Sequence, residues 1–373
     1  MEERMNRLRA LAERGTAVWL DFLSREIIDN GHLQKLIDDD GLAGVTANPS
    51  IFEKAMGESD AYDAGIARLV GDGSLSVTGI YEKLATADIA AAADKFRPLY
   101  DRSEGRHGFV SLEVSPYLAM DTAATMMEAR RLWTEVQREN IFIKVPATPP
   151  GIPAIRDLLA EGINVNITLM FTVSQYQAVA EAYLRGMERT PDPRRVTSVA
   201  SFFVSRIDTA VDRALEEIGT PEALALRGKA GIANATLAYH RFREIFFSPE
   251  FEKMRKRGVR IQKPLWASTS TKNKAYSDVM YIEGLLAPDS INSMPPETLE
   301  AFLDHGKARI ALDQNSAEAA RDVVGQLVGM GIALKSVGQE LTDEGVEKFI
   351  QSYDELIDAL EKKRAALART EAA

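Results

Sequence analysis

The sequence predicts an α/β fold, a single (β/α)8 barrel with additional C-terminal helices. Short apolar runs alternate with longer segments of helical periodicity from the N-terminal region to Pro295. Eight such runs occur, and each is followed by a helical segment, which is typical of a closed parallel TIM barrel. An open doubly wound sheet is the alternative. The sequence contains neither G-x-G-x-x-G nor G-x-x-x-x-G-K-[ST], the glycine-rich phosphate fingerprints of such sheets, and this favours the barrel.

The strand candidates are short and rich in β-branched and aromatic residues. In chain order they are Val18–Leu23, Gly44–Phe52, Phe109–Ser115, Asn140–Thr148, Ile163–Phe171, Val196–Val204, Pro264–Ser268 and Ser290–Met294. The second candidate runs into a turn at Pro49, and the eighth has the weakest pattern. Between them lie helical segments, of which the clearest are Tyr81–Tyr100, Asp121–Glu139, Ile152–Glu161 and Ser174–Gly186. Ser174 is the expected N-cap of the last of these helices.

The chain is nearly all helical in pattern after Pro296. Apolar residues recur at helical spacing between Gly345 and Leu367, and packing against the barrel explains this face without a partner protein. We therefore expect a barrel catalytic domain over residues 1–296 and a C-terminal helical extension over residues 297–373, packed on the barrel.

Composition excludes several classes of function. The 373 residues carry a net charge of −10 and no cysteine, so disulfides, thiolate catalysis and cysteine metal sites are excluded. An acidic chain is unsuited to general nucleic-acid binding, and the basic segment Lys253–Arg260 is interpreted as a solvated turn before a strand. No apolar run reaches membrane-spanning length, and the N-terminus lacks a signal-peptide pattern. We expect a cytoplasmic protein with no membrane or nucleic-acid partner.

The histidines do not suggest a metal site. His32, His107, His240 and His305 are scattered along the chain outside the strand interiors, and no H-E-x-x-H pair occurs. Ordinary surface or packing roles are expected for them, and no metal is expected.

One lysine, Lys144, stands in the middle of the fourth strand candidate. An unpaired ammonium group is costly to bury, and burial lowers the pKa of a lysine. A neutral amine in a dry site is a nucleophile that forms Schiff bases with carbonyl compounds. The alternative is that Lys144 lies at a strand end and points to water.

Polar residues interrupt one face of strand after strand. Side chains two residues apart share a face, and one face of each barrel strand points inward. The predicted inward sets are Trp19 and Asp21; Ser111, Glu113 and Ser115; Phe142, Lys144 and Pro146; Asn164, Asn166 and Thr168; and Thr197, Val199, Ser201 and Phe203, with Asn48 near the end of the second strand. Most of the polar members lie near C-terminal strand ends, where barrel enzymes carry out their chemistry.

This inventory suits carbonyl chemistry. Lys144 can attack a ketone, and Asp21 and Glu113 are the carboxylates on the inward faces available for proton transfer. Thr168 and Ser201 can position water or hydroxyl groups. Arg206 and Lys272 follow the sixth and seventh strands and could bind a phosphate group, although a surface salt bridge is an equal alternative for Arg206.

These residues lie in motifs that resemble those of class I transaldolases, the Schiff-base-forming enzymes of the pentose phosphate pathway, and most closely the longer bacterial type. The motifs are Gly44-Val-Thr-Ala-Asn-Pro-Ser50, Ser111-Leu-Glu-Val114, Ile143-Lys-Val-Pro-Ala-Thr148, Gly162-Ile-Asn-Val-Asn-Ile-Thr-Leu169 and Ser201-Phe-Phe-Val-Ser-Arg206. The resemblance implies a (β/α)8 barrel with Lys144 as the Schiff-base lysine and Asp21 as the general acid/base.

The resemblance also implies roles for the remaining site residues. Glu113 and Thr168 match a pair that holds a catalytic water, and Asn48 and Asn166 match residues that bind the dihydroxyacetone part of the substrate. The other matches are Ser201 and Phe203, which line the site, and Arg206, a phosphate ligand. The family's second phosphate-binding arginine falls within Trp266–Lys272, which contains no arginine, so Lys272 with help from Ser268 is expected to replace it.

The implied reaction transfers dihydroxyacetone from sedoheptulose 7-phosphate to glyceraldehyde 3-phosphate and needs no metal or organic cofactor. Phosphorylated sugars are the expected partners, and a homodimer is one expectation for the assembly. Two alternatives stay open. A related fructose 6-phosphate aldolase would release free dihydroxyacetone, but Glu113 and Phe203 favour transfer. A catalytically silent sugar-phosphate-binding barrel is disfavoured by the intact set of Lys144, Asp21 and Glu113.

Overall fold

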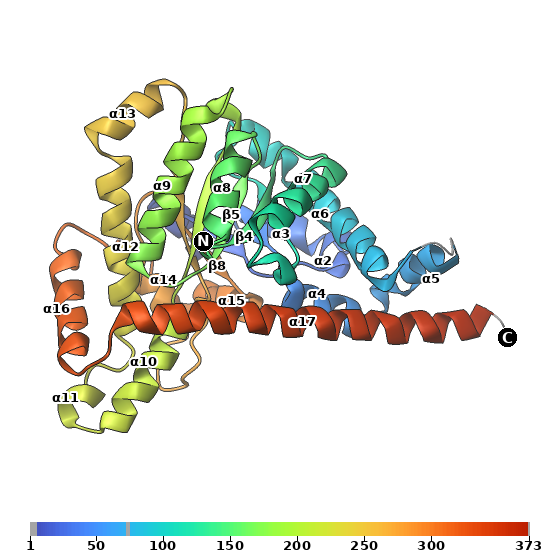
Figure 1. Cartoon of the computed structure of the whole chain (residues 1–373). Helices are drawn as coiled ribbons and strands as arrows, with labels where there is room; N and C mark the ends of the chain where they lie inside the picture. The colour runs from blue at the N-terminus through green and yellow to red at the C-terminus, as the bar shows by residue number, and fades with distance from the viewer. Residues whose placement is uncertain (1–5, 72–74, 372–373) are drawn as a thin grey trace, which may run out of the picture.

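Eight parallel strands close into a barrel in the computed structural model, which describes residues 6–71 and 75–371. The strands follow one another around the barrel in chain order, and β8 closes on β1 (Figure 1). Their bounds are β1 Thr16–Leu20, β2 Gly44–Thr46, β3 Phe109–Glu113, β4 Ile141–Pro146, β5 Val165–Met170, β6 Ser198–Phe203, β7 Lys263–Ala267 and β8 Ser290–Met294. The predicted (β/α)8 barrel with additional helices is confirmed.

Helices surround the barrel and extend beyond it. They are α1 Arg7–Glu13, α2 Arg25–Asp29, α3 His32–Asp38, α4 Pro49–Glu58, α5 Asp63–Gly71, α6 Val77–Arg102, α7 Thr122–Val136, α8 Gly151–Ala160, α9 Val173–Arg189, α10 Ser205–Ile218, α11 Pro221–Leu224, α12 Ala230–Phe246, α13 Pro249–Lys256, α14 Met280–Gly284, α15 Pro296–His305, α16 Ser316–Gly329 and α17 Leu334–Glu371. Across the described ranges, no helix has both the length and the hydropathy needed to cross a membrane.

Two local predictions were wrong. The second strand ends at Thr46, and Pro49 begins helix α4 instead of a turn. Asn48 caps this helix by accepting a hydrogen bond from the Ile51 amide, and proline is favourable in a first helical turn. The N-cap of α9 is Thr172, not Ser174. Thr172 and Gln175 form a reciprocal capping box, which satisfies two amide groups at this helix start.

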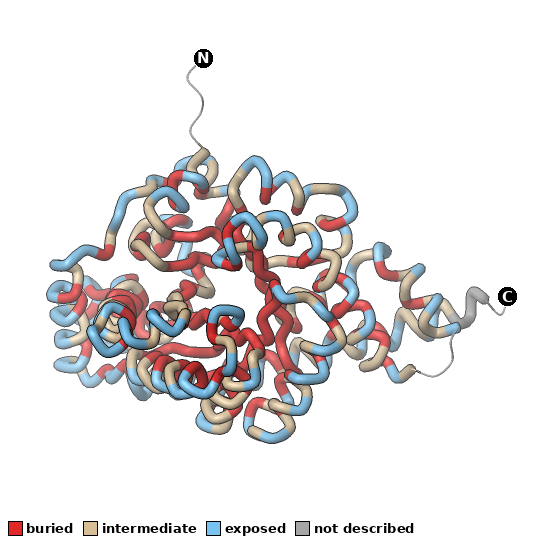
Figure 2. The backbone as a smooth tube through the Cα atoms, turned by 90° about the horizontal axis from the view of Figure 1, so that it is seen from above, coloured by how far each residue is buried: buried red, intermediate tan, exposed pale blue. Residues whose placement is uncertain are grey.

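The barrel interior and the layer beneath the helices have separate apolar cores. The interior core consists of Ala17, Trp19, Ala43, Phe109, Phe142, Val199, Leu265 and Ile291. Its rings are in contact, with centroids 4.5 Å apart for Phe109 and Phe142 and 6.0 Å apart for Trp19 and Phe142. The intervening strand residues, such as Val110, Ile143 and Ile167, pack outward against helices. The buried residues therefore concentrate at the centre of the molecule, as Figure 2 shows.

The strand register brings polar side chains of neighbouring strands together. Glu113 of β3 pairs with Lys144 of β4, and Lys144 pairs with Asn166 of β5. Thr168 pairs with Pro146, one inward step further along the strands. The alternation predicted from the sequence thus places these side chains in adjacent layers near the C-terminal ends of the strands.

Helix α17 lies along one side of the molecule, in contact with α4, α5, α6, α10 and β5 (Figure 1). Glycines allow its close approach to the barrel. A Cβ atom at Gly338 would lie 2.1 Å from Cγ2 of Thr172, and one at Gly345 would lie 2.8 Å from Cδ2 of Leu169. The predicted apolar face of this helix packs on the barrel, including Tyr353, whose ring lies 5.7 Å from that of Tyr81. The division of the chain at residue 296 stays a prediction.

Candidate active site

A cavity of about 480 Å³ opens at the C-terminal end of the barrel. This volume lies within the range of roughly 300–1,000 Å³ that is usual for small-molecule sites. Nine of the eleven site residues predicted from the sequence line it: Asp21, Asn48, Lys144, Thr168, Ser201, Phe203, Arg206, Ser268 and Lys272. The other two, Glu113 and Asn166, lie behind this lining and contact members of it. The structure therefore brings the whole predicted set together.

Lys144 does not point to bulk water. The residue is 4% exposed, and its Nζ lies 3.1 Å from Oε2 of Glu113 and 3.4 Å from the carbonyl oxygen of Ala47. Burial raises the pKa of Glu113, Asp21 adds to this effect, and the Lys144 ammonium group opposes both. The pair can therefore pass a proton between two buried groups at hydrogen-bond distance, which is the step that converts an ammonium group into a nucleophilic amine.

Asp21 follows directly after β1 and is held by the neighbouring strands. The Thr46 hydroxyl donates a hydrogen bond of 2.6 Å to Oδ1 of Asp21, and Thr46 also contacts the hydroxyl of Ser293 at 3.0 Å. Burial raises the pKa of Asp21, whereas Lys144 and the Thr46 hydrogen bond lower it. A carboxyl group whose pKa is shifted towards neutrality is suited to general acid/base catalysis.

Two buried polar atoms near Lys144 are unsatisfied. Within the part of the chain that the structure describes, neither Oε1 of Glu113 nor Oγ1 of Thr168 has a hydrogen-bond partner. The register places these residues on the strands either side of Lys144. Buried polar groups are normally paired, and a water molecule or a substrate hydroxyl can supply the partner. The arrangement is compatible with the water-holding role predicted for this pair, which stays a prediction.

Asn166 is fixed by two side chains of adjacent strands. The Ser201 hydroxyl donates to Oδ1 of Asn166 at 2.7 Å, and Nδ2 of Asn166 donates to the Ser111 hydroxyl at 3.0 Å. This network orients the amide beneath the cavity. Asn48 uses its side-chain oxygen to cap α4, at 3.1 Å from the Ile51 amide nitrogen, which directs its NH2 group away from that contact.

Cationic side chains lie at the cavity wall. The guanidinium carbon of Arg206 lies 5.4 Å from the ring centre of Phe203. Burial lowers the pKa of Arg206, and Glu344 and Asp21 oppose this shift. Lys272 is exposed and donates to the Ser270 hydroxyl at 2.7 Å. Together these groups can hold a phosphate monoester. No cluster of three or more His, Asp or Glu side chains placed to bind a metal occurs in the described ranges.

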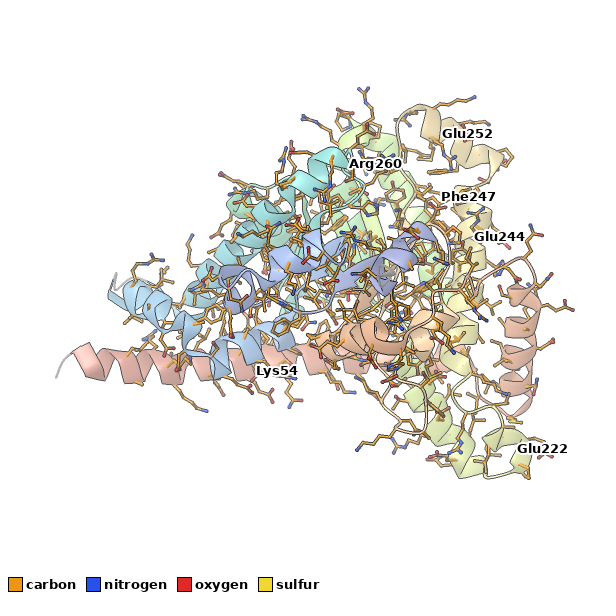
Figure 3. All side chains as sticks on the ribbon, turned by 180° about the vertical axis from the view of Figure 1, so that it is seen from behind. Lys54, Glu222, Glu244, Phe247, Glu252 and Arg260 are labelled. Carbon is orange, nitrogen blue, oxygen red and sulfur yellow. The ribbon has the colours of Figure 1, made fainter. Side chains whose placement is uncertain are left out.

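The cavity also contains residues that the sequence did not indicate. They include Thr46, Lys54 of α4, Glu297 of α15 and Phe349 of α17. Thr46 lies two residues before Asn48, so strand alternation could have identified it. Figure 3 shows Lys54 close to α17. Phe349 belongs to the apolar face between Gly345 and Leu367 that packing against the barrel was expected to explain. The periodicity of that face does not show that the Phe349 ring covers a cavity.

The fold and site together define a class: a (β/α)8-barrel enzyme with a buried lysine–carboxylate pair at the C-terminal end of its strands, suited to carbonyl chemistry. The transaldolase/fructose-6-phosphate aldolase family model matches residues 18–360. The chain belongs to this family.

Three relatives named "Transaldolase" illustrate the similarity. The protein from Mycolicibacterium smegmatis is 46% identical over 356 residues, covering 94% of this chain and 96% of its own. The Mycobacterium ulcerans protein is 46% identical over 367 residues, covering 97% and 98%. The Mycobacterium tuberculosis (strain CDC 1551 / Oshkosh) protein is 46% identical over 355 residues, covering 94% and 95%. The similarity therefore extends through the C-terminal helices as well as the barrel.

Proposed function

We propose that the protein is a transaldolase that moves a dihydroxyacetone unit from sedoheptulose 7-phosphate to glyceraldehyde 3-phosphate. The observation that carries the proposal is the buried pair of Lys144 and Glu113, 3.1 Å apart at a cavity of sugar-phosphate size. Family membership and relatives named "Transaldolase" support the same reaction.

The first step forms the Schiff base. Lys144 gives a proton to Glu113, and the free amine attacks the C2 carbonyl carbon of the ketose, whose oxygen takes up a proton to form a carbinolamine. A second proton then converts the hydroxyl into a leaving water, and the nitrogen lone pair forms the iminium. Asp21 is the group proposed to supply this proton, because burial raises its pKa.

The second step breaks the C3–C4 bond. Asp21, now ionised, takes the proton of the C4 hydroxyl as that carbon becomes an aldehyde. The bonding electron pair moves into the iminium and leaves an enamine on Lys144, and erythrose 4-phosphate departs. Glyceraldehyde 3-phosphate then enters, the enamine carbon attacks its carbonyl, and Asp21 returns the proton to the new hydroxyl. Hydrolysis of the iminium releases fructose 6-phosphate and restores Lys144.

Transfer requires the enamine to survive between the two sugars. The rings of Phe203 and Phe349 lie on the cavity wall, and Lys144 is 4% exposed. Apolar walls limit the water that reaches the intermediate, which favours its capture by an acceptor over its hydrolysis. This arrangement favours transfer over release of free dihydroxyacetone.

The phosphate group supplies binding energy at a distance from the reacting carbons. Arg206 and Lys272 are the proposed ligands, with Ser268 beside them. The hydroxyls of Ser268 and Ser205 lie 2.9 Å apart, which fixes the loop after β7 against the start of α10.

Because charged sugar phosphates do not cross an apolar bilayer unaided, we also place the enzyme in the cytoplasm, where fractionation would locate it.

A product assay tests the proposal. Incubation with both substrates is expected to yield erythrose 4-phosphate and fructose 6-phosphate, whereas Lys144→Met is expected to yield neither. Release of dihydroxyacetone from fructose 6-phosphate at the transfer rate, without any acceptor, would instead identify a fructose 6-phosphate aldolase. A folded wild-type protein that forms no product from either assay would be a silent barrel, and the proposal would fail.

A further inference from the structure

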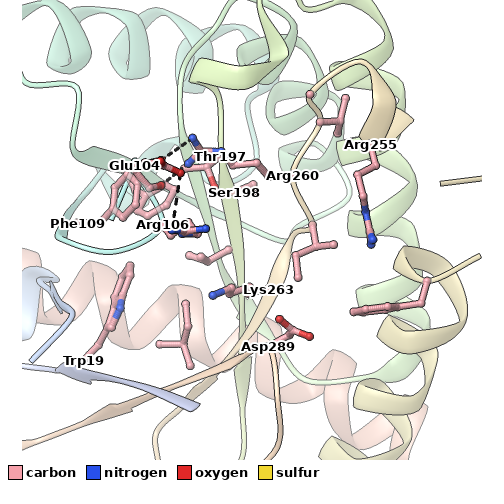
Figure 4. A pocket seen from close by; sticks show the side chains of 18 residues that line it. Trp19, Glu104, Arg106, Phe109, Thr197, Ser198, Arg255, Arg260, Lys263 and Asp289 are labelled. Carbon is pink, nitrogen blue, oxygen red and sulfur yellow. Dashed lines mark hydrogen bonds and ion pairs between the residues drawn. The ribbon is translucent and has the colours of Figure 1, made fainter. Parts of the chain in front are cut away.

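A second cavity, of about 620 Å³, lies at the N-terminal end of the barrel. Its lining includes the first residues of several strands, Phe109 of β3, Ser198 of β6 and Lys263 of β7, so it opens at the end opposite the active site. Figure 4 shows these side chains converging with Arg106 and Arg260 on one space. In Figure 3, Phe247 and Arg260 lie far from Lys54 and α17, which border the catalytic cavity. None of the proposed catalytic groups lines this second cavity.

Positive charge gathers around this cavity although the chain as a whole is acidic. Among the described residues, its lining contains Arg106, Arg255, Arg260 and Lys263 but only two carboxylates, Glu104 and Asp289, against a net charge of −10 for the protein. Both Arg255 and Arg260 come from the basic segment that the sequence suggested was a solvated turn. The segment does end α13 and precede β7, but two of its arginines line the cavity.

Carboxylates neutralise this charge only weakly. Arg255 lies 3.6 Å from Glu252, and both of these side chains are about half exposed. Asp289 lies 3.5 Å from Arg243, which is outside the cavity lining. The guanidinium group of Arg260 donates to the backbone carbonyls of Glu104 and Gly105, contacts that orient it without neutralising it. The nearest approach of Glu104 to Arg106 is 3.7 Å between two exposed side chains, a weak interaction in water.

Lys263 is the central cation of this group. It shares the inward face of β7 with Leu265, a member of the interior core, so its side chain lies at the mouth of the barrel. Over residues 6–71 and 75–371, its Nζ has no hydrogen-bond or ion-pair partner. Burial lowers its pKa, and Asp289 opposes this shift. A part-buried ammonium group without a partner favours an anion beside it.

Aromatic surfaces complete the cavity. Phe247 stands at its rim with 41% of its surface exposed, whereas Trp19, Phe109 and Phe142 close its floor and are only 1–3% exposed. The guanidinium carbon of Arg243 lies 3.6 Å from the Phe247 ring centre, which holds this ring in place. One exposed aromatic ring beside a group of cations matches a ligand that has both a planar ring and an anionic group.

We propose that this N-terminal cavity binds a small organic phosphate that carries a planar ring, with Lys263, Arg260 and Arg106 holding the phosphate and Phe247 contacting the ring. Sugar phosphates without a planar ring fit the charge but offer no partner for the Phe247 ring. The site is separate from the catalytic cavity and does not depend on the reaction proposed above.

Adenosine 5′-monophosphate is a suitable probe, and calorimetric titration of the whole chain measures its binding. We expect saturable binding that is at least about tenfold tighter than that of inorganic phosphate or adenosine alone. Lys263→Met is expected to weaken binding by at least about tenfold, because it removes a charge-assisted hydrogen bond at nearly constant volume. The matched control Arg206→Met removes a cation from the catalytic cavity and is expected to leave binding unchanged. Trp19 provides a fluorescence signal for the same titration.

Several results would overturn this assignment. The first is no binding of adenosine 5′-monophosphate at concentrations on the order of 5 mM. The second is loss of its binding in Arg206→Met but not in Lys263→Met. The third is an affinity for inorganic phosphate equal to that for adenosine 5′-monophosphate. Circular dichroism verifies the fold of each variant. Should Lys263→Met not fold, Arg106→Gln tests the same point, because Arg106 is a proposed phosphate ligand and its side chain is 64% exposed. Unchanged affinity in a folded Arg106→Gln would then count against the site.

Discussion

Replacing Lys144 by methionine leaves the Glu113 carboxyl group in a buried layer without its cation. The two charged atoms are 3.1 Å apart, and their side chains are 5% and 3% exposed. At an effective dielectric constant of about 20, the lost attraction is about 5 kcal/mol. Glu113 can avoid part of this loss by taking up a proton in the folded state.

The cost of that proton sets an upper limit on the destabilisation. From the ordinary carboxyl pKa of 4.5, protonation costs about 3 kcal/mol at pH 7 and below about 1 kcal/mol at pH 5. A carboxyl whose folded pKa is raised contributes its stability below the unfolded pKa and loses it as pH rises through the folded pKa. Lys144→Met should therefore lose up to about 3 kcal/mol at pH 7, and most of this loss should disappear by pH 5.

Urea unfolding of wild type, Lys144→Met, Glu113→Gln and the double variant, followed by circular dichroism at both pH values, measures this coupling. The double variant should be more stable than Lys144→Met at pH 7, because it contains no unpaired buried carboxylate. Equal stability of these two variants at pH 7, together with a loss in Lys144→Met that does not change with pH, would refute the reasoning.

Three further predictions concern other parts of the molecule. In steady-state kinetics, Arg206→Met should raise KM for glyceraldehyde 3-phosphate by roughly 10- to 100-fold and change KM for unphosphorylated glyceraldehyde little. An equal rise in KM for both aldehydes would argue against a role of Arg206 in phosphate binding. Gly338→Ala should destabilise the protein by about 1–3 kcal/mol in urea unfolding, because the added Cβ atom would lie 2.1 Å from Cγ2 of Thr172. In the control Gly329→Ala, at the end of α16, the added Cβ atom would have no neighbour within 4 Å, so this variant should be as stable as wild type or more stable. Burial raises the pKa of Asp208 from 3.8 to about 6, so its stabilising effect is present below about pH 4 and is lost as pH rises through about 6. Asp208→Asn should therefore gain about 3 kcal/mol of stability relative to wild type between about pH 3 and about pH 7, and parallel pH profiles of the two proteins would contradict this.

Strand alternation explains why most of the site could be predicted from the sequence. Glu113, Lys144, Asn166 and Ser201 all lie on inward faces, and their order along each strand determines their depth in the barrel. Strand ends were less accurate. Strand β1 begins at Thr16, two residues before the predicted start, because Thr16 pairs with Ser290 and Ala17 with Ile291 of β8. Such a contact between distant segments leaves no local signal.

Residues from outside the strands could not be predicted in the same way. Phe349 reaches the catalytic cavity only because α17 packs along the barrel through Gly338 and Gly345. The N-terminal cavity likewise forms only where three segments come together: the loop around Arg106, the segment that contains Arg260, and the start of β7. Periodicity reports which face of an element is apolar, but it does not report which distant segment covers that face.

The most direct measurement is borohydride reduction in the presence of fructose 6-phosphate, followed by peptide mass spectrometry. We predict that a reduced dihydroxyacetone or hexose phosphate adduct forms on the peptide that contains Lys144, and that Lys144→Met has no adduct there. An adduct on another lysine, or none at saturating ketose in an active enzyme, would contradict a Schiff-base mechanism at Lys144.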